Sequence, residues 1–142
     1  MDIKEALAKA PIFAALRPDL VDSLAAVAKV AGFKPGDLLV REAEEAAAFF
    51  VLLRGYAEVV KGFELDGEQV IGHLSEGDFF GEMALLDGFP RSASVLAVRD
   101  CECLVLMRDD FLTLVRNNVD VALAILPVLS RRLRDCEDQL LP

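Results

Sequence analysis

The hydrophobic residues of this chain follow two periods, one typical of helices and one typical of strands. Up to residue 31 they recur at three- and four-residue spacing, and Pro11 separates a first short helix from a second. Gly32 is a residue suited to ending a helix. We therefore expect helices over residues 1–31. The apolar stripe of the second helix consists of Leu20, Leu24, Val27, Ala28 and Ala31.

Residues 32–107 have the short period of strands. The apolar runs are DLLVRE, AFFVLL, YAEVVKGFEL, QVIGHL, SASVLAV and CECLVLM, and the turn sequences between them are KPGD, RG, DGE, SEGD and LDGFP. Such a series predicts an antiparallel sandwich or barrel. Asp66 and Gly67 give the strongest hairpin signal, because this pair tolerates the positive φ angles of a tight turn.

Residues 109–140 return to the helical period. DDFLTLVRNN predicts a short helix with acidic residues at its N-terminal end, and VDVALAILPVLSRRLRDCEDQL predicts a longer one. Pro127 lies inside the longer helix, where it removes a backbone hydrogen bond, so we expect a kink and two segments. The predicted architecture is helices, then a β-roll, then helices.

The longer helix carries an apolar seam of period 3.5, as in a coiled coil. This seam predicts a homodimer, although the same residues would also suit packing against the sheet. The seam consists of Ala122, Leu126, Leu129, Leu133, Cys136 and Leu140.

Length and charge narrow the classes of protein. A chain of 142 residues has the length of one domain, which we expect to span residues 1–142. A formal charge of −9 would repel a nucleic acid, whereas one well-placed arginine can still bind a small anion. The longest apolar run, AAAFFVLL, is far shorter than the ~20 residues of a membrane helix. We expect a cytoplasmic protein without direct nucleic-acid or membrane contact.

The residues of common active sites are scarce. The chain has one histidine, His73, and no GxSxG sequence, which argues against a catalytic triad and against a histidine-rich metal site. The three cysteines, Cys101, Cys103 and Cys136, lack the spacing of a metal site or a disulfide framework. The acidic run at residues 42–45 is interpreted as a solvated face. We expect no enzyme activity and no cofactor.

One stretch, GDFFGEMALLDGFPRSASV at residues 77–95, places an arginine among glycines, small hydroxyls and apolar residues. Gly81 followed by EMALL predicts a strand turning into a short helix, whose free N–H groups at residues 82–84 would face one point. Arg91 returns on the next segment and would add a planar fork of donors, suited to a phosphate. The alternative is a structural salt bridge between Arg91 and Glu82.

The same stretch closely resembles the phosphate-binding cassette of the cyclic nucleotide-binding domain family. The matching residues are Phe80-Gly81-Glu82, Ala84-Leu85 and Pro90-Arg91-Ser92-Ala93, within a cassette at residues 79–95. FKPGDLLV, FFVLLRGYAEVV, LSEGDFFGE and LPVLSRRLRD extend the likeness over nearly the whole chain. The loop REAEEAAAFF departs from the family because it lacks the usual Glu-Gly-Asp turn. The resemblance implies a jelly-roll-like double-stranded β-helix with a short cassette helix and a C-terminal helix.

The resemblance also implies roles for single residues. Arg91 would bind the cyclic phosphate, Glu82 the ribose 2′-hydroxyl, and the backbone of residues 81–84 with Ser92 would complete the cradle. Val59 and Ile71 would line an apolar pocket, and the C-terminal helix would bring Arg132 and Cys136 to the purine. The full implied set is Phe80, Gly81, Glu82, Met83, Ala84, Arg91, Ser92, Ala93, Val59, Ile71, Arg132 and Cys136.

Ser92 follows the cassette arginine, where cAMP-binding members have alanine or serine and members that prefer cGMP often have threonine. The resemblance therefore favours cAMP over cGMP. The chain ends at Pro142, about where bacterial relatives begin a helix-turn-helix domain, so we expect a stand-alone receptor module that signals to another protein. The rival hypothesis is a nucleotide-free β-roll that serves as an interaction or dimerisation scaffold.

Overall fold

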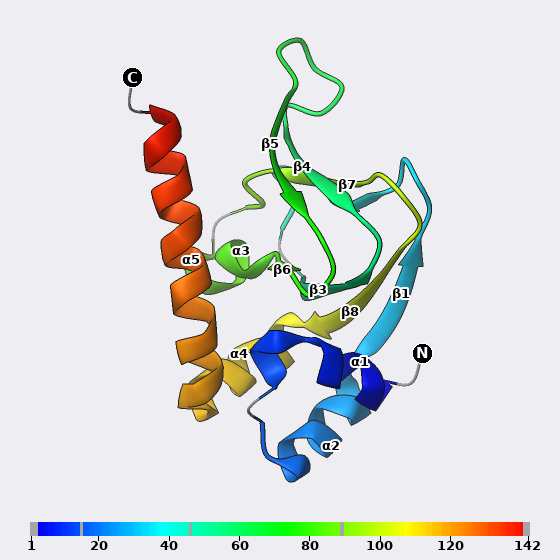
Figure 1. Ribbon diagram of the computed structural model, residues 1–142, viewed down its shortest axis with the longest axis vertical. Coiled ribbons are helices and arrows are strands. Elements are labelled where there is room, and N and C mark those ends of the chain that lie inside the picture. The colour runs from blue at the N-terminus through cyan, green and yellow to red at the C-terminus, as the bar shows by residue number, and fades with distance from the viewer. Residues whose placement is uncertain (1–2, 15, 46, 89, 141–142) are drawn as a thin grey trace.

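The computed structural model describes residues 3–14, 16–45, 47–88 and 90–140. Helices lie at both ends of the chain and a roll of short strands lies between them (Figure 1). The helices are α1 (Ile3–Lys9), the 3-10 helix η1 (Pro11–Phe13), α2 (Pro18–Val27), α3 (Glu82–Asp87), α4 (Arg108–Asn117) and α5 (Val119–Leu140). The strands are β1 (Lys29–Phe33), β2 (Leu38–Val40), β3 (Ala48–Arg54), β4 (Ala57–Lys61), β5 (Gln69–Leu74), β6 (Phe79–Phe80), β7 (Ser94–Ala97) and β8 (Cys101–Met107).

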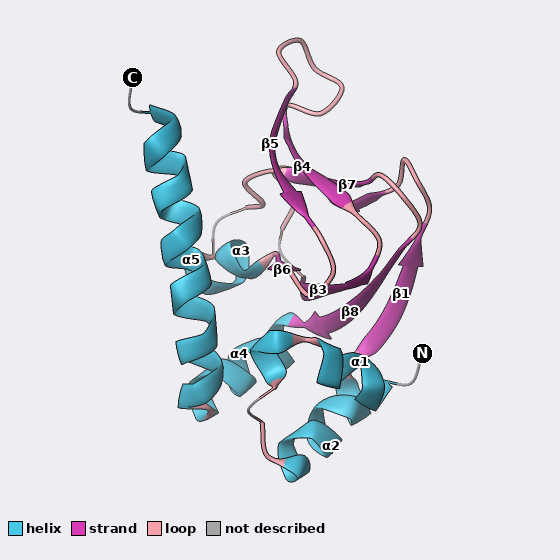
Figure 2. Cartoon of the chain, in the orientation of Figure 1, coloured by secondary structure: helices cyan, strands magenta, loops and turns pink. Residues whose placement is uncertain are grey.

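The strands form two four-stranded antiparallel sheets, in the orders β1-β8-β3-β6 and β2-β7-β4-β5. Figure 2 shows the strands wrapped around a common interior, with α1, α2 and α4 gathered at one end and α5 standing beside the roll. This arrangement confirms the predicted fold class, a mainly β antiparallel roll with flanking helices, a short helix α3 and a C-terminal helix.

Strand β3 separates two hydrophobic clusters, because residues 48–53 are all buried and successive side chains point to opposite faces. On one face Phe49 stacks on Phe111 of α4, with ring centroids 4.4 Å apart, and joins the cluster beneath the helices. On the other face Phe50 and Leu52 join the cluster inside the roll. A strand buried on both faces explains the unbroken apolar run in the sequence.

Two local features differ from the expectations. Strand β1 begins at Lys29, so residues 29–31 belong to the sheet, where they pair with β8, and do not continue the second helix. The hairpin between β4 and β5 forms as expected, but residues 62–68 connect it instead of a two-residue turn. Gly62, Glu64 and Gly67 all have positive φ, and together they build two successive turns.

Helix α5 runs without interruption through Pro127, so the expectation of two segments was wrong. Pro127 is exposed. The carbonyl group that loses its helical partner there can therefore bond water, and the missing bond does not end the helix.

Among the described residues, no single helix combines the length and apolarity needed to cross a membrane. The pair α4 and α5 meets those criteria only when joined, and it bends by 106° at the break.

Candidate functional site

The site begins at Gly81, the residue between β6 and α3. Its φ of +88° lies in the region that favours glycine. A Cβ atom there would lie 2.6 Å from Nη1 of Arg91 and 3.2 Å from the carbonyl oxygen of Ala48. The glycine therefore lets the chain turn into α3 and lets Arg91 approach the backbone.

Arg91 is held inside the protein by main-chain acceptors. Its Nη1 donates to the Gly81 carbonyl at 2.7 Å and its Nη2 to the Ala48 carbonyl at 2.7 Å, and the residue is 7% exposed. The guanidinium also lies 5.9 Å from the ring centroid of Phe50, which stacks on Phe80 at 4.9 Å. Phe80, predicted to contact ligand, is thus buried and packs on the ring that lies near Arg91.

The connection between β2 and β3 pairs with the backbone of Arg91. Ala43 donates its N–H to the Arg91 carbonyl at 2.8 Å, and the Arg91 N–H donates to the Glu44 carbonyl at 2.9 Å. Ala43 has a φ of 71°, which a residue other than glycine rarely adopts. This connection fixes the direction in which Arg91 enters the roll.

Glu82, the first residue of α3, is 2% exposed and pairs with Arg132 of α5. Nη1 of Arg132 lies 2.7 Å from Oε1 of Glu82, and its Nη2 donates to the Phe79 carbonyl. The Arg132 guanidinium also lies 4.8 Å from the ring centroid of Phe79. Phe79 of β6 and Glu82 of α3 therefore bind one arginine of the C-terminal helix together.

Burial controls the ionisation of both charged cassette residues. It raises the pKa of Glu82 above its ordinary value, while Arg132 and, to a smaller extent, Arg91 oppose the rise. Burial also lowers the pKa of Arg91, which nevertheless stays charged because the guanidinium is such a strong base.

The structure does not contain the salt bridge between Arg91 and Glu82 that was the structural alternative. Within the part of the chain that the structure describes, Glu82 has Arg132 as its ion-pair partner, and no carboxylate oxygen lies within 4.0 Å of the Arg91 guanidinium nitrogens. Arg91 is therefore a buried cation whose direct partners are neutral carbonyl groups.

Strands β4, β5 and β7 form the wall beside the cassette. Val59 pairs in register with Val95 of β7 on one side and with Gly72 of β5 on the other. A Cβ added at Gly72 would be in van der Waals contact with Val59, at 3.7 Å. Ile71 is 46% exposed. Val59 thus lies beside β7, the strand that follows Arg91, and Ile71 lies in the same sheet one strand further away.

The remaining predicted residues lie around this centre. Ser92 is exposed and Ala93 is buried, directly after Arg91. Met83 and Ala84 follow Glu82 in α3, and their side chains lie outside the described residues. Cys136 is exposed on α5, four residues beyond Arg132.

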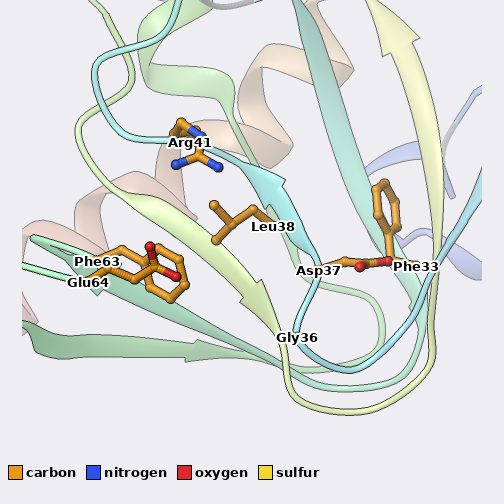
Figure 3. Close-up of a pocket in the computed structure, with 7 residues that line it drawn as sticks. All are labelled: Phe33, Gly36, Asp37, Leu38, Arg41, Phe63 and Glu64. Atoms are coloured by element: carbon orange, nitrogen blue, oxygen red, sulfur yellow. The ribbon is translucent and has the colours of Figure 1, made fainter.

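A shallow cavity of about 520 Å³ lies elsewhere, between the β1–β2 turn and the β4–β5 connection (Figure 3). None of its lining residues belongs to the predicted site. They are Phe33, Gly36, Asp37, Leu38, Arg41, Phe63 and Glu64.

Sequence reasoning missed the supports of the site. The carbonyl of Ala48 and the ring of Phe50 hold Arg91, and both come from β3, 43 and 41 residues earlier, where nothing in the local pattern marks them. The pairing of Glu82 with Arg132 was missed as well. A buried carboxylate needs a cationic partner, but a single sequence does not say which arginine provides it.

Comparison with known proteins shows which family the chain belongs to. Residues 31–118 match the model of the cyclic nucleotide-binding domain. The cyclic AMP receptor protein of Thermus thermophilus is 32% identical over 130 residues, 92% of this chain and 60% of the relative. Human cGMP-dependent protein kinase 2 is 40% identical over 81 residues, 56% of this chain and 11% of the kinase. The chain thus spans 60% or less of these curated relatives.

A solved structure shows the same fold. The structure of a cyclic nucleotide-binding domain from Methylobacillus flagellatus matches with a TM-score of 0.80 and 28% identity, over 99% of this chain and 82% of that one. The family match covers the roll, the cassette and α4. The chain belongs to the cyclic nucleotide-binding domain family.

Proposed function

We propose that this chain is a non-catalytic receptor module that binds a cyclic nucleotide, with cAMP preferred to cGMP. Arg91 binds the cyclic phosphate and Glu82 accepts a hydrogen bond from the ribose 2′-hydroxyl. The backbone from Gly81 to Ala84 and Ser92 completes the phosphate cradle, and Val59 and Ile71 contact the base from the roll. From α5, Arg132 and Cys136 approach the purine.

The observation that carries this proposal is the environment of Arg91. Buried charges in proteins are normally paired with an opposite charge. Arg91 is 7% exposed and bonds only to two backbone carbonyls among the described residues. A guanidinium has five N–H donors, so donors remain after these two bonds. The carboxylates of Glu82 and Glu44 act on Arg91 only from a distance, so an anionic ligand would supply a directly bonded negative charge. The planar fork of donors suits phosphate oxygens.

The Glu82–Arg132 pair would let ligand binding affect the position of α5. The pair ties the C-terminal helix to the residue that would accept the ribose hydroxyl. Ligand binding would change the partners of Glu82 and therefore the position that α5 prefers. Such a switch requires the nucleotide to bind more tightly to one position of α5 than to the other.

A second copy of this chain is the partner we propose for α5. Leu126 and Leu133 of the predicted seam are 58% and 62% exposed, whereas Leu129 is partly buried against the chain's own core. Val119 and Leu123 extend the exposed stripe toward the start of the helix. The dimer would place both stripes together, and an effector protein, still to be identified, would read its state.

The exposed stripe also favours the rival function, a nucleotide-free dimerisation scaffold. A dimerisation scaffold does not require a buried arginine that lacks a carboxylate partner. The two functions therefore predict different effects of replacing Arg91.

Calorimetric titration of Arg91→Ala with cAMP separates them. Removing one side of a buried charge pair costs about 2–5 kcal/mol, so the receptor function predicts a dissociation constant at least about thirtyfold higher. Arg99→Ala is the matched control, because Arg99 is exposed and lies over Tyr56, 5.5 Å from its ring centroid. Equal affinity of the wild type and folded Arg91→Ala would remove Arg91 from the site.

A further inference from the structure

Lys61, the last residue of β4, reaches across to the cassette. Its Nζ donates to the backbone carbonyl of Ser92, the residue directly after Arg91. Lys61 was not among the residues predicted to bind ligand, and it lies 31 positions before Ser92 in the chain. The roll therefore brings a second cation to the segment that carries Arg91.

Glu42 is the partner of this lysine. Its Oε2 lies 3.7 Å from Lys61 Nζ, and its Oε1 accepts the N–H of Gly62 at 2.9 Å. The Glu42 N–H donates to the hydroxyl of Ser94 at 2.9 Å. Glu42 was expected on a solvated acidic face, but its side chain is only 32% exposed because these bonds draw it onto the roll. Glu42 thus connects the β2–β3 connection, the end of β4 and the start of β7.

The charge of Lys61 acts at short range. Consecutive Cα atoms are ~3.8 Å apart, and charges are screened over about 8 Å at physiological ionic strength. The ammonium group bonds to Ser92 itself, so it lies within this range of the cassette backbone. Its carboxylate partner stands 3.7 Å away, within ion-pair range but farther than a direct hydrogen bond.

We propose that Lys61 is a second positive group of the phosphate loop, and that Glu42 limits its strength. Through the Ser92 carbonyl, Lys61 holds the loop in position, and through its charge it raises the affinity for an anion. Lys61 is thus a positioning residue with an electrostatic effect. This inference rests on the proposed function, since it concerns the same cyclic phosphate site.

Two substitutions separate this role from a merely structural clasp. Lys61→Met removes the charge and the bond to Ser92, and we expect cAMP to bind about two- to fivefold more weakly. Glu42→Gln removes the opposing charge but keeps an oxygen that can accept from Gly62. We therefore expect unchanged or tighter binding for Glu42→Gln. A structural clasp predicts the opposite for Glu42→Gln, because breaking either end of it would loosen the loop.

The test is calorimetric titration with cAMP at several salt concentrations, for the wild type, Lys61→Met, Lys61→Arg and Glu42→Gln. Lys61→Met should show a weaker salt dependence of its dissociation constant than the wild type, because it has one positive charge fewer near the phosphate. Lys61→Arg keeps that charge and should restore the salt dependence of the wild type. Equal affinity and equal salt dependence of the wild type and Lys61→Met would overturn the inference. So would weaker binding by folded Glu42→Gln.

The same experiment tells the two proposals apart. A wild type that binds neither cAMP nor cGMP would overturn the proposed function and this inference together. A wild type that binds while Lys61→Met behaves identically would overturn only the role of Lys61.

Discussion

Replacing Gly81 with alanine tests the link between the cassette backbone and Arg91. At a φ of +88°, the left-handed backbone costs a residue with a Cβ about 1–2 kcal/mol. The new Cβ would also lie 2.6 Å from Nη1 of Arg91. The guanidinium is the end of a flexible side chain and can move away, so the further cost is its lost hydrogen bond to the Gly81 carbonyl. Such charged bonds are worth about 1.5–3 kcal/mol.

We expect Gly81→Ala to lower the free energy of unfolding by about 2.5–5 kcal/mol. We expect it also to weaken cAMP binding at least about tenfold, because the displaced guanidinium no longer faces the phosphate. Gly67→Ala is the matched control. Gly67 has a φ of +83° and no neighbouring atom within 4 Å of a built Cβ, so this variant should show only the backbone cost of about 1–2 kcal/mol and normal affinity.

Urea denaturation gives both free energies of unfolding, and calorimetry of the folded variants gives the affinities. Equal destabilisation of the two variants, together with normal cAMP affinity of Gly81→Ala, would refute the claim that Gly81 positions Arg91.

Three further predictions concern other parts of the molecule. Burial raises the pKa of Glu82 and Arg132 opposes the rise, so cAMP affinity should fall as the pH drops through that pKa. Arg132→Met removes the opposing charge and should move this loss of affinity to higher pH. An unchanged pH profile of affinity over about pH 5–8 would contradict the pairing of Glu82 with Arg132. Gly55→Ala should destabilise the fold by about 3 kcal/mol or more in urea titrations, since its Cβ would lie 2.4 Å from the rigid Asp100 carbonyl, and a loss below about 1 kcal/mol would argue against that contact. If α5 forms a parallel dimer, mild oxidation should cross-link two native chains through the exposed Cys136. Cys136→Ser should abolish the cross-link, because the other two cysteines are buried. A band of monomer size alone on non-reducing gels would count against the dimer.

The sequence predicted those parts of the fold that local pattern specifies. The strand runs, the helical ends and the cassette turn were visible because apolar periodicity and glycine positions are local signals. Of the predicted pocket residues, Val59 lies in β4, beside the strand that follows Arg91, and Ile71 lies one strand further away, in β5. The length of the β4–β5 connection was misjudged, because Asp66-Gly67 favours a tight turn and the strand pairing instead ends earlier, at Lys61 and Gln69.

The contacts between distant segments could not be predicted in the same way. Arg132 meets Glu82 across 50 residues, and Arg91 meets Ala48 across 43. These contacts depend on the path of α5 and on the pairing of β3, which only the folded chain determines. Pro127 shows the reverse case, since its local signal favours a break and its exposed position in α5 lets the helix continue.

The central claim is that the cassette binds a cyclic nucleotide through Arg91. Calorimetric titration of the purified chain, stripped of co-purified nucleotide, with cAMP, cGMP and linear 5′-AMP tests it most directly. We predict saturable binding of cAMP at micromolar concentration or below, weaker binding of cGMP and little binding of 5′-AMP. No heat from any of the three, from a chain shown to be folded by circular dichroism, would contradict the receptor function and favour the nucleotide-free scaffold.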